Sequence, residues 1–196
     1  LAAELNFNVM FSRRGHLTLA HSDSALRTMR WRAEVNKHEG VSSEVIDPDQ
    51  IARLVGPLDV STDTRYPILG ALYHPPGGIV RHDAVVWGYA RAADARSCPG
   101  VAAARCGLAA GAVVNCTAGW SSVVAGMAGV ELPVTTFPLQ AAVTEPVRPF
   151  LHAVVVSGTL HVYVSQSDGG EVVFGASVDP FTSFSLRGSL EFVEGL

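Results

Sequence analysis

The sequence predicts a mixed fold of helices and strands, of the α+β class or of the α/β class with an antiparallel sheet insert. Strand patterns and amphipathic helix patterns alternate up to about residue 130, and the chain is strand-like from Leu132 onward. The 196 residues are 48% hydrophobic and 16% charged, which is enough apolar material for a substantial core. These observations predict a globular chain of one large domain or two small ones.

The first part of the chain combines short strands with amphipathic helices. Apolar residues alternate through residues 7–20 on both sides of Arg13-Arg14-Gly15, which predicts a hairpin. A helix is expected over residues 22–40, and Asp47 and Pro48 have the cap and first-turn pattern of a second, short helix. Further strands are expected at residues 41–46 and 68–73.

The middle of the chain predicts two more helices. The first, at residues 83–96, follows a turn-rich loop and has an apolar face that includes Val86 and Tyr89. Residues 97–111 are rich in Ala and Gly and support no assignment. A buried-type strand is then expected at residues 112–116, followed by a turn and a helix at residues 121–128 that Ser121 or Ser122 caps.

The last part of the chain is expected to form a sheet. The expected strands cover residues 134–144, 152–156, 160–166 and 171–178, with a hairpin turn at residues 167–170.

Composition narrows the classes of partner and location. The net charge of −4 has no basic block, so nothing indicates nucleic acid or an anionic membrane surface. The longest apolar run is too short to span a bilayer, and a cytoplasmic location is the default expectation. Three cysteines without CxxC spacing predict no disulfide framework or zinc site, and the histidines have no metal-ligand spacing, so no metal is expected.

His82 lies at the junction between a glycine-rich turn and a helix. The first turn of a helix has free backbone N–H groups and a partial positive charge, which disfavours imidazolium and favours a neutral, nucleophilic ring. The same free N–H groups can also donate hydrogen bonds to a phosphate. A plain helix-start residue remains the alternative interpretation.

Residues 113–122 form the second candidate segment, because Ala118 and Gly119 would let a backbone approach a phosphate or an isoalloxazine ring. An ordinary strand-turn-helix joint has the same composition. No GxGxxG fingerprint follows a strand, and Ser121 and Ser122 lack a nucleophile elbow, so no catalytic residue is identified. His161, Tyr163 and Ser165 alternate on one expected strand face and could line a pocket.

Several segments resemble the beta subunit of heterotetrameric sarcosine oxidase. The resemblance covers about residues 1–96 and 112–195, and the Arg-His-Asp motif at residues 81–83 is its most specific part. The segments that carry the resemblance are residues 6–17, 65–71, 77–92, 127–133, 161–166 and 174–176.

The resemblance implies a partial D-amino-acid-oxidase-like flavoprotein fold. Residues 1–75 and 132–180 would belong mainly to the substrate domain, with its mixed sheet, and residues 77–130 to an incomplete FAD-binding domain. It implies oxidation of sarcosine to glycine and a one-carbon unit, with noncovalent FAD passing electrons to a covalent FMN and then to oxygen, giving hydrogen peroxide. The partners implied are sarcosine or a related small amine and the other subunits of a hetero-oligomer.

The resemblance also assigns roles to individual residues. The flavin-linking histidine falls on His82, and Arg81 would meet the FMN phosphate. The small-residue turn beside FAD corresponds loosely to Cys116, Thr117, Ala118 and Gly119. Because the family's GxGxxG unit and C-terminal part have no counterpart in these residues, an internal fragment that is inactive alone is expected. The alternatives are an FAD-only glycine or D-amino-acid oxidase and a noncatalytic assembly module.

Overall fold

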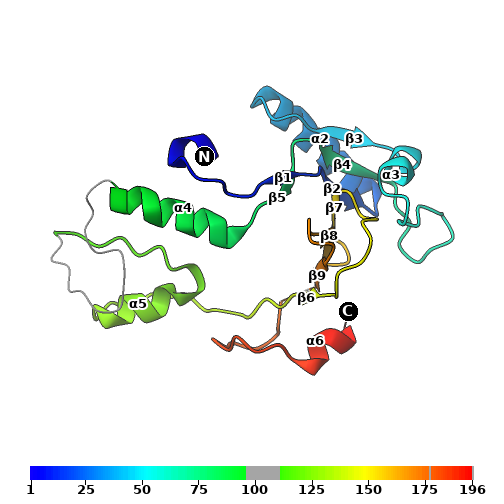
Figure 1. The fold of residues 1–196 in the computed structure, drawn as a ribbon. Coiled ribbons are helices and arrows are strands. Elements are labelled where there is room, and N and C mark those ends of the chain that lie inside the picture. Colours follow the sequence, from blue (N-terminus) through cyan, green and yellow to red (C-terminus); the bar gives the residue numbers. More distant parts are fainter. Residues whose placement is uncertain (96–110, 177, 196) are drawn as a thin grey trace. The chain divides into compact units, whose positions relative to one another are not determined.

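The computed structural model describes residues 1–95, 111–176 and 178–195. The chain divides into two compact units (Figure 1). The smaller unit contains Leu1–Met10, Arg81–Leu139 and Val178–Gly188, and the larger unit contains Phe11–Val80, Gln140–Ser177 and Ser189–Leu196. Residues 97–111, for which the sequence supports no assignment, lie almost entirely outside the described residues.

The larger unit contains a mixed sheet of seven strands in the order β3-β4-β2-β7-β8-β9-β6. Neighbouring strands are antiparallel except β2 and β7, which pair in parallel with Leu17 opposite Val155. The strands are β2 (His16–Ala20), β3 (Glu44–Ile46), β4 (Gly70–His74), β6 (Ala142–Val143), β7 (Val154–Ser157), β8 (Val162–Gln166) and β9 (Val172–Ala176). The mixed sheet agrees with the predicted fold class.

Two helices of the larger unit begin where the sequence predicts. In α2 (Asp23–His38), the Ser22 side chain accepts a hydrogen bond from the Ala25 N–H, which satisfies a free donor of the first turn. In α3 (Pro48–Leu54), Asp47 and Gln50 form a reciprocal capping box. Both helix starts therefore depend on local side-chain chemistry. The unit also contains α6 (Leu190–Gly195).

The core lies on both faces of the sheet. Leu17 and Leu19 of β2 cluster with Ile51 of α3, whereas the adjacent Ala20 clusters with Met29 of α2. Because successive side chains of a strand point to opposite faces, α2 and α3 cover opposite faces of the sheet. Both helices lie beside β3 and β4 in Figure 1.

The hairpin predicted over residues 7–20 is wrong. Strand β1 (Ser12–Arg13) pairs with β5 (Gly78–Ile79) in a separate two-stranded sheet, while β2 pairs with β4 and β7. Gly15 joins β1 to β2 with a φ of 78°, a left-handed conformation that suits glycine. The two strands thus separate at this residue instead of folding back on each other.

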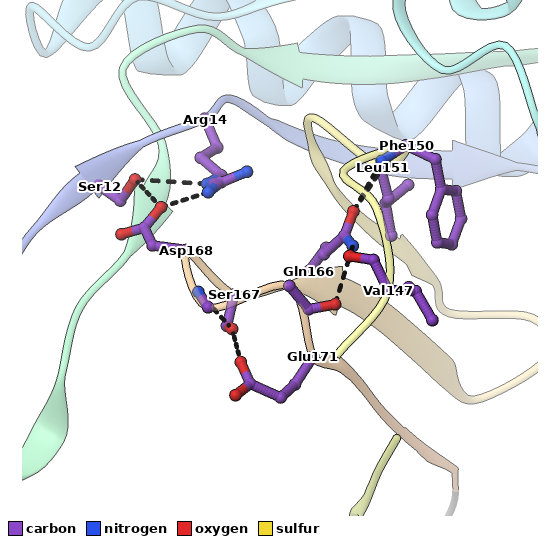
Figure 2. A network of polar contacts seen from close by, with 11 residues as sticks. Ser12, Arg14, Val147, Phe150, Leu151, Gln166, Ser167, Asp168 and Glu171 are labelled. Atoms are coloured by element: carbon purple, nitrogen blue, oxygen red, sulfur yellow. Dashed lines mark hydrogen bonds and ion pairs between the residues drawn. The ribbon is translucent and has the colours of Figure 1, made fainter. Parts of the chain in front are cut away.

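The predicted hairpin turn at residues 167–170 is confirmed between β8 and β9 (Figure 2). Gln166, only 1% exposed, lies at its base. Its Oε1 accepts from the N–H groups of Phe150 and Leu151 at 2.9 and 3.1 Å, and its Nε2 donates to the Gly170 carbonyl at 2.9 Å. One side chain therefore connects the hairpin to the segment that leads into β7.

The described part of the smaller unit contains helices but no strands. They are α1 (Ala2–Leu5), α4 (His82–Ala95), the 3-10 helix η1 (Ala118–Trp120) and α5 (Ser121–Met127). The strand predicted at residues 112–116 is wrong, because these residues have no regular structure, and the strand predicted at 134–144 forms only as β6. Neither predicted serine caps α5, since Trp120 holds the N-cap position without a side-chain hydrogen bond.

Candidate functional site

His82 is the first residue of α4, one residue before the predicted start. The Val85 N–H donates to the Arg81 carbonyl at 3.1 Å, which places Arg81 at the N-cap position. The His82 side chain is exposed. The sequence prediction of a histidine in the first helical turn is therefore confirmed, and its ring is accessible.

The charged neighbours of His82 interact with each other. Arg81 Nε lies 3.6 Å from Asp83 Oδ1, and both side chains are largely exposed. A hydrogen bond from the Ala84 backbone N–H holds the pKa of the Asp83 carboxyl below its usual value, and the Arg81 charge contributes in the same direction. The Asp83 carboxylate is thus the anion that pairs with Arg81 at this helix start.

One side of α4 packs against the N-terminal residues of the chain. A Cβ added to Gly88 would lie 3.1 Å from the Phe7 ring, so glycine permits this close approach. The Arg91 guanidinium lies over the same ring, 5.6 Å from its centroid. These contacts attach α4 to the segment around α1.

The other side of α4 carries His82, Val86 and Tyr89, at positions i, i+4 and i+7. Residues at this spacing share a helix face. Val86 is 63% exposed and Tyr89 55% exposed, so the described residues do not cover the apolar face that the sequence predicts for this helix. An exposed imidazole therefore lies at one end of an exposed apolar stripe that Val86 and Tyr89 form.

The second candidate segment also lies in the smaller unit. Asn115 organises it: its Oδ1 accepts from the Thr117 N–H and hydroxyl at 3.2 and 2.7 Å, and its Nδ2 donates to the Ser121 carbonyl at 2.9 Å. The Thr136 hydroxyl donates to the Gly119 carbonyl at 2.6 Å. Cys116, Thr117 and Ala118 are exposed on this ordered turn.

Ala118 has a φ of 47°, in the left-handed region that residues with a Cβ rarely adopt. The conformation costs about 1–2 kcal/mol for a residue other than glycine. Strained backbone of this kind is concentrated at functional sites. The conformation of Ala118 is therefore a structural reason, separate from composition, to consider this turn a candidate site.

Of the pocket residues suggested by strand alternation, His161 lies outside the strand, with a φ of 53°. Tyr163 and Ser165 are on β8, and both are partly buried. A Cβ at Gly175, opposite Tyr163 on β9, would lie 2.7 Å from the Tyr163 ring. The ring thus lies across the neighbouring strand.

Sequence reasoning missed the contacts of two histidines. His21 Nδ1 lies 2.9 Å from the Tyr66 carbonyl oxygen, so Nδ1 carries a hydrogen, and Nε2 forms a hydrogen bond with the Ser157 hydroxyl at 2.9 Å. His16 lies opposite His74 on the paired strands β2 and β4. Burial lowers the pKa of His16, and the neighbouring His74 adds to this effect. Sequence separation of 136 residues concealed the His21–Ser157 contact.

Within the described ranges, no group of three or more His, Cys, Asp or Glu side chains has the arrangement of a metal site. None of the helices described is long and apolar enough to cross a membrane.

The mixed sheet agrees with the fold of the family that the sequence matches. A family model described as FAD dependent oxidoreductase (DAO) matches residues 1–196, and the chain belongs to this family. Within it, the chain is similar to sarcosine oxidase subunit beta. It is 40% identical to that subunit from Rhodobacter capsulatus and 38% identical to that from Arthrobacter sp, over 99% of this chain in both comparisons. The chain spans about half the length of these relatives, 51% and 52% respectively.

Solved structures support the same fold. L-proline dehydrogenase from P. horikoshii superimposes with a TM-score of 0.79 at 22% identity, covering 99% of this chain and 56% of that one. Glycine oxidase from Geobacillus kaustophilus gives a TM-score of 0.76 at 18% identity, covering 100% of this chain and 56% of that one. The predicted D-amino-acid-oxidase-like fold is confirmed.

Proposed function

We propose that this chain is part of a flavin-dependent amine oxidase that converts sarcosine to glycine and a one-carbon unit. One observation carries the proposal: in a chain 40% identical to a sarcosine oxidase subunit beta, the histidine of the Arg-His-Asp motif is exposed in the first turn of α4. An accessible imidazole is what covalent attachment to a flavin requires.

His82 is proposed as the attachment site of FMN. An imidazole nitrogen would bond to the 8α methyl carbon, with loss of one hydrogen from each. The two hydrogens and two electrons would reduce the flavin ring, which oxygen would reoxidise, giving hydrogen peroxide. The exposed stripe of Val86 and Tyr89 would lie beside the ring. Arg81 would bind the FMN phosphate, since a guanidinium has five N–H donors and the Asp83 contact uses only part of them.

Noncovalent FAD is proposed to lie against the turn at Cys116, Thr117, Ala118 and Gly119. The strained, exposed backbone at Ala118 offers an approach unobstructed by a long side chain. When both flavins are bound, they supply oxidation of the amine and transfer of its electrons to oxygen, giving hydrogen peroxide. This chain contributes attachment and positioning.

We propose that these roles are divided along the chain; the two units support this division except at residues 77–80, which belong to the larger unit, and at residues 1–10, 132–139 and 178–180, which belong to the smaller unit. We assign residues 77–130 mainly to flavin binding, and residues 1–75 and 132–180, which contain most of the sheet, mainly to the substrate domain. The substrate would be sarcosine or a related small amine. The protein partners would be the other subunits of a hetero-oligomer, and the location would be the cytoplasm.

The test uses a full-length relative carrying these residues, coexpressed with its partner subunits. After denaturation and acid precipitation, yellow colour should remain with the protein and disappear in the His82→Ala variant. His38→Ala, an exposed histidine on α2, is the matched control and should retain the colour. Persistence of the colour in His82→Ala would refute the attachment site.

The same preparation separates two alternatives. Complete release of the flavin as FAD by acid would indicate an FAD-only glycine or D-amino-acid oxidase. A flavin-free chain that copurifies with the partner subunits would indicate a noncatalytic assembly module.

A further inference from the structure

A groove of about 440 Å³ opens in the larger unit, and its lining contains no residue of the two candidate flavin segments. Its lining comes from β1, the β1–β2 connection, the end of β4 with Pro75 after it, and His152, two residues before β7. The volume is within the range of small-molecule sites, about 300–1,000 Å³. Gly15 and Tyr73 shape the groove: a Cβ at Gly15 would lie 2.8 Å from Tyr73 Cε2, so the ring packs directly on the backbone.

Two arginines and a histidine line this groove, namely Arg13, Arg14 and His152, and no carboxylate among the described residues does. Next to them, the Asp168 carboxylate from the β8–β9 turn bonds to Arg14 Nη2 and accepts from the Ser12 hydroxyl at 2.9 Å (Figure 2). The Arg14 hydrogen bond, with a smaller effect from Ser12, holds the pKa of Asp168 below its usual value. The groove wall therefore already binds one carboxylate.

Arg13 and His152 differ from Arg14 in their contacts within the part of the chain that the structure describes. Arg13 Nε donates to the Pro75 carbonyl at 3.4 Å, which leaves the terminal guanidinium nitrogens for another acceptor. Among the described residues, neither Arg13 nor His152 forms an ion pair with a carboxylate. A guanidinium presents a planar pair of donors that matches a carboxylate or a phosphate.

We propose that this groove binds a small molecule that carries carboxylate or phosphate groups. Arg13 and His152 would contact one carboxylate or phosphate group of the ligand. A second anion position lies beside it, where Arg14 and Ser12 bind the Asp168 carboxylate. The proposal is independent of flavin attachment, because none of the groove residues belongs to the candidate flavin site.

The test is isothermal titration calorimetry of the full chain with sodium citrate and, separately, with inorganic phosphate, at constant ionic strength. Saturable binding is expected, and its strength with each anion distinguishes a polycarboxylate from a phosphate ligand. Arg13→Gln should weaken binding about tenfold, the loss expected for one charge-assisted contact. Arg30→Gln removes the same charge from an exposed position on α2 and should leave affinity unchanged.

A second variant, expected to bind more tightly, keeps the test decisive if Arg13→Gln fails to fold. Asp168→Asn removes the competing carboxylate and frees Arg14, so citrate should bind several-fold more tightly. Absence of saturable binding by both anions, or equal weakening by Arg30→Gln, would overturn the proposal. Unchanged or weaker citrate binding in Asp168→Asn, with native circular dichroism, would also contradict it.

Discussion

Replacement of Gln166 by Met should destabilise the larger unit more than any exposed polar substitution. The Gln166 amide connects the start of the β8–β9 turn to the segment before β7. Besides the bonds described above, its Nε2 donates to the carbonyls of Val147 and Arg148, both at 3.3 Å. Methionine has a similar length but can neither donate to these carbonyls nor replace the acceptor.

The magnitude follows from the hydrogen-bond inventory. Oε1 accepts two bonds, and the two hydrogens on Nε2 are shared among three carbonyls, so about four bonds are made at once. At about 1 kcal/mol net for each bond, the substitution costs about 4 kcal/mol, less what the more apolar side chain gains on burial. We therefore expect a loss of about 3 kcal/mol, a large part of the 5–15 kcal/mol typical of a native domain.

Urea unfolding of the full chain, followed by circular dichroism, measures this loss. With a slope of about 2 kcal/mol per molar urea, the midpoint should fall by about 1.5 M. Gln50→Met is the matched control, because Gln50 is exposed and its capping contact should be worth less than about 1 kcal/mol. A midpoint in Gln166→Met that moves no further than in this control would refute the reasoning.

Three other changes should alter stability in defined directions. Ser157→Ala should cost about 1–3 kcal/mol in urea unfolding, because it leaves the Leu160 N–H and His21 Nε2 without their partner. The pKa of His16 is lowered from 6.5 in the folded chain, so the unfolded chain binds more protons below that pH. Stability should therefore decline as the pH falls below 6.5, and His16→Asn should reduce this decline. Gly15→Ala should lower the melting temperature, because its φ of 78° disfavours a Cβ that would also contact the Tyr73 ring at 2.8 Å.

Matched substitutions show whether these effects have the stated causes. Gly158→Ala introduces a Cβ where nothing lies within 4 Å, so a melting temperature lowered as much as in Gly15→Ala would contradict the steric explanation. His38→Asn alters an exposed histidine, and an equal reduction in pH dependence would contradict the assignment to His16. Ser42→Ala should leave the urea midpoint unchanged; a shift equal to that of Ser157→Ala would count against the His21 contact.

The parts of the fold that local chemistry specifies could be predicted from the sequence. Ser22 caps α2, Asp47 and Gln50 form the capping box of α3, and the Asp-Gly-Gly turn joins β8 to β9. In each case, the residues that determine the element are within a few positions of one another. Sequence reading is most reliable for such elements.

Strand pairing could not be predicted in the same way. The alternation around Gly15 identified extended residues but not their partners, which are β5 for one strand and β4 and β7 for the other. Residues 112–116 have the apolar composition of a buried strand, yet Val113 is 85% exposed and the segment pairs with no described strand. A strand requires a hydrogen-bonding neighbour, and composition does not show whether one is present.

For the candidate site, too, the sequence could not predict which residues lie against an element. Helical periodicity correctly places Val86 and Tyr89 on one face of α4, but it cannot determine what covers that face. The structure attaches α4 through its other side, where Gly88 admits the Phe7 ring, and leaves His82, Val86 and Tyr89 exposed together. The helix is therefore held in place without use of the stripe that begins at the histidine. Because anchoring and exposed faces are separate, a substitution in the stripe can test flavin attachment without removing the contacts that hold α4.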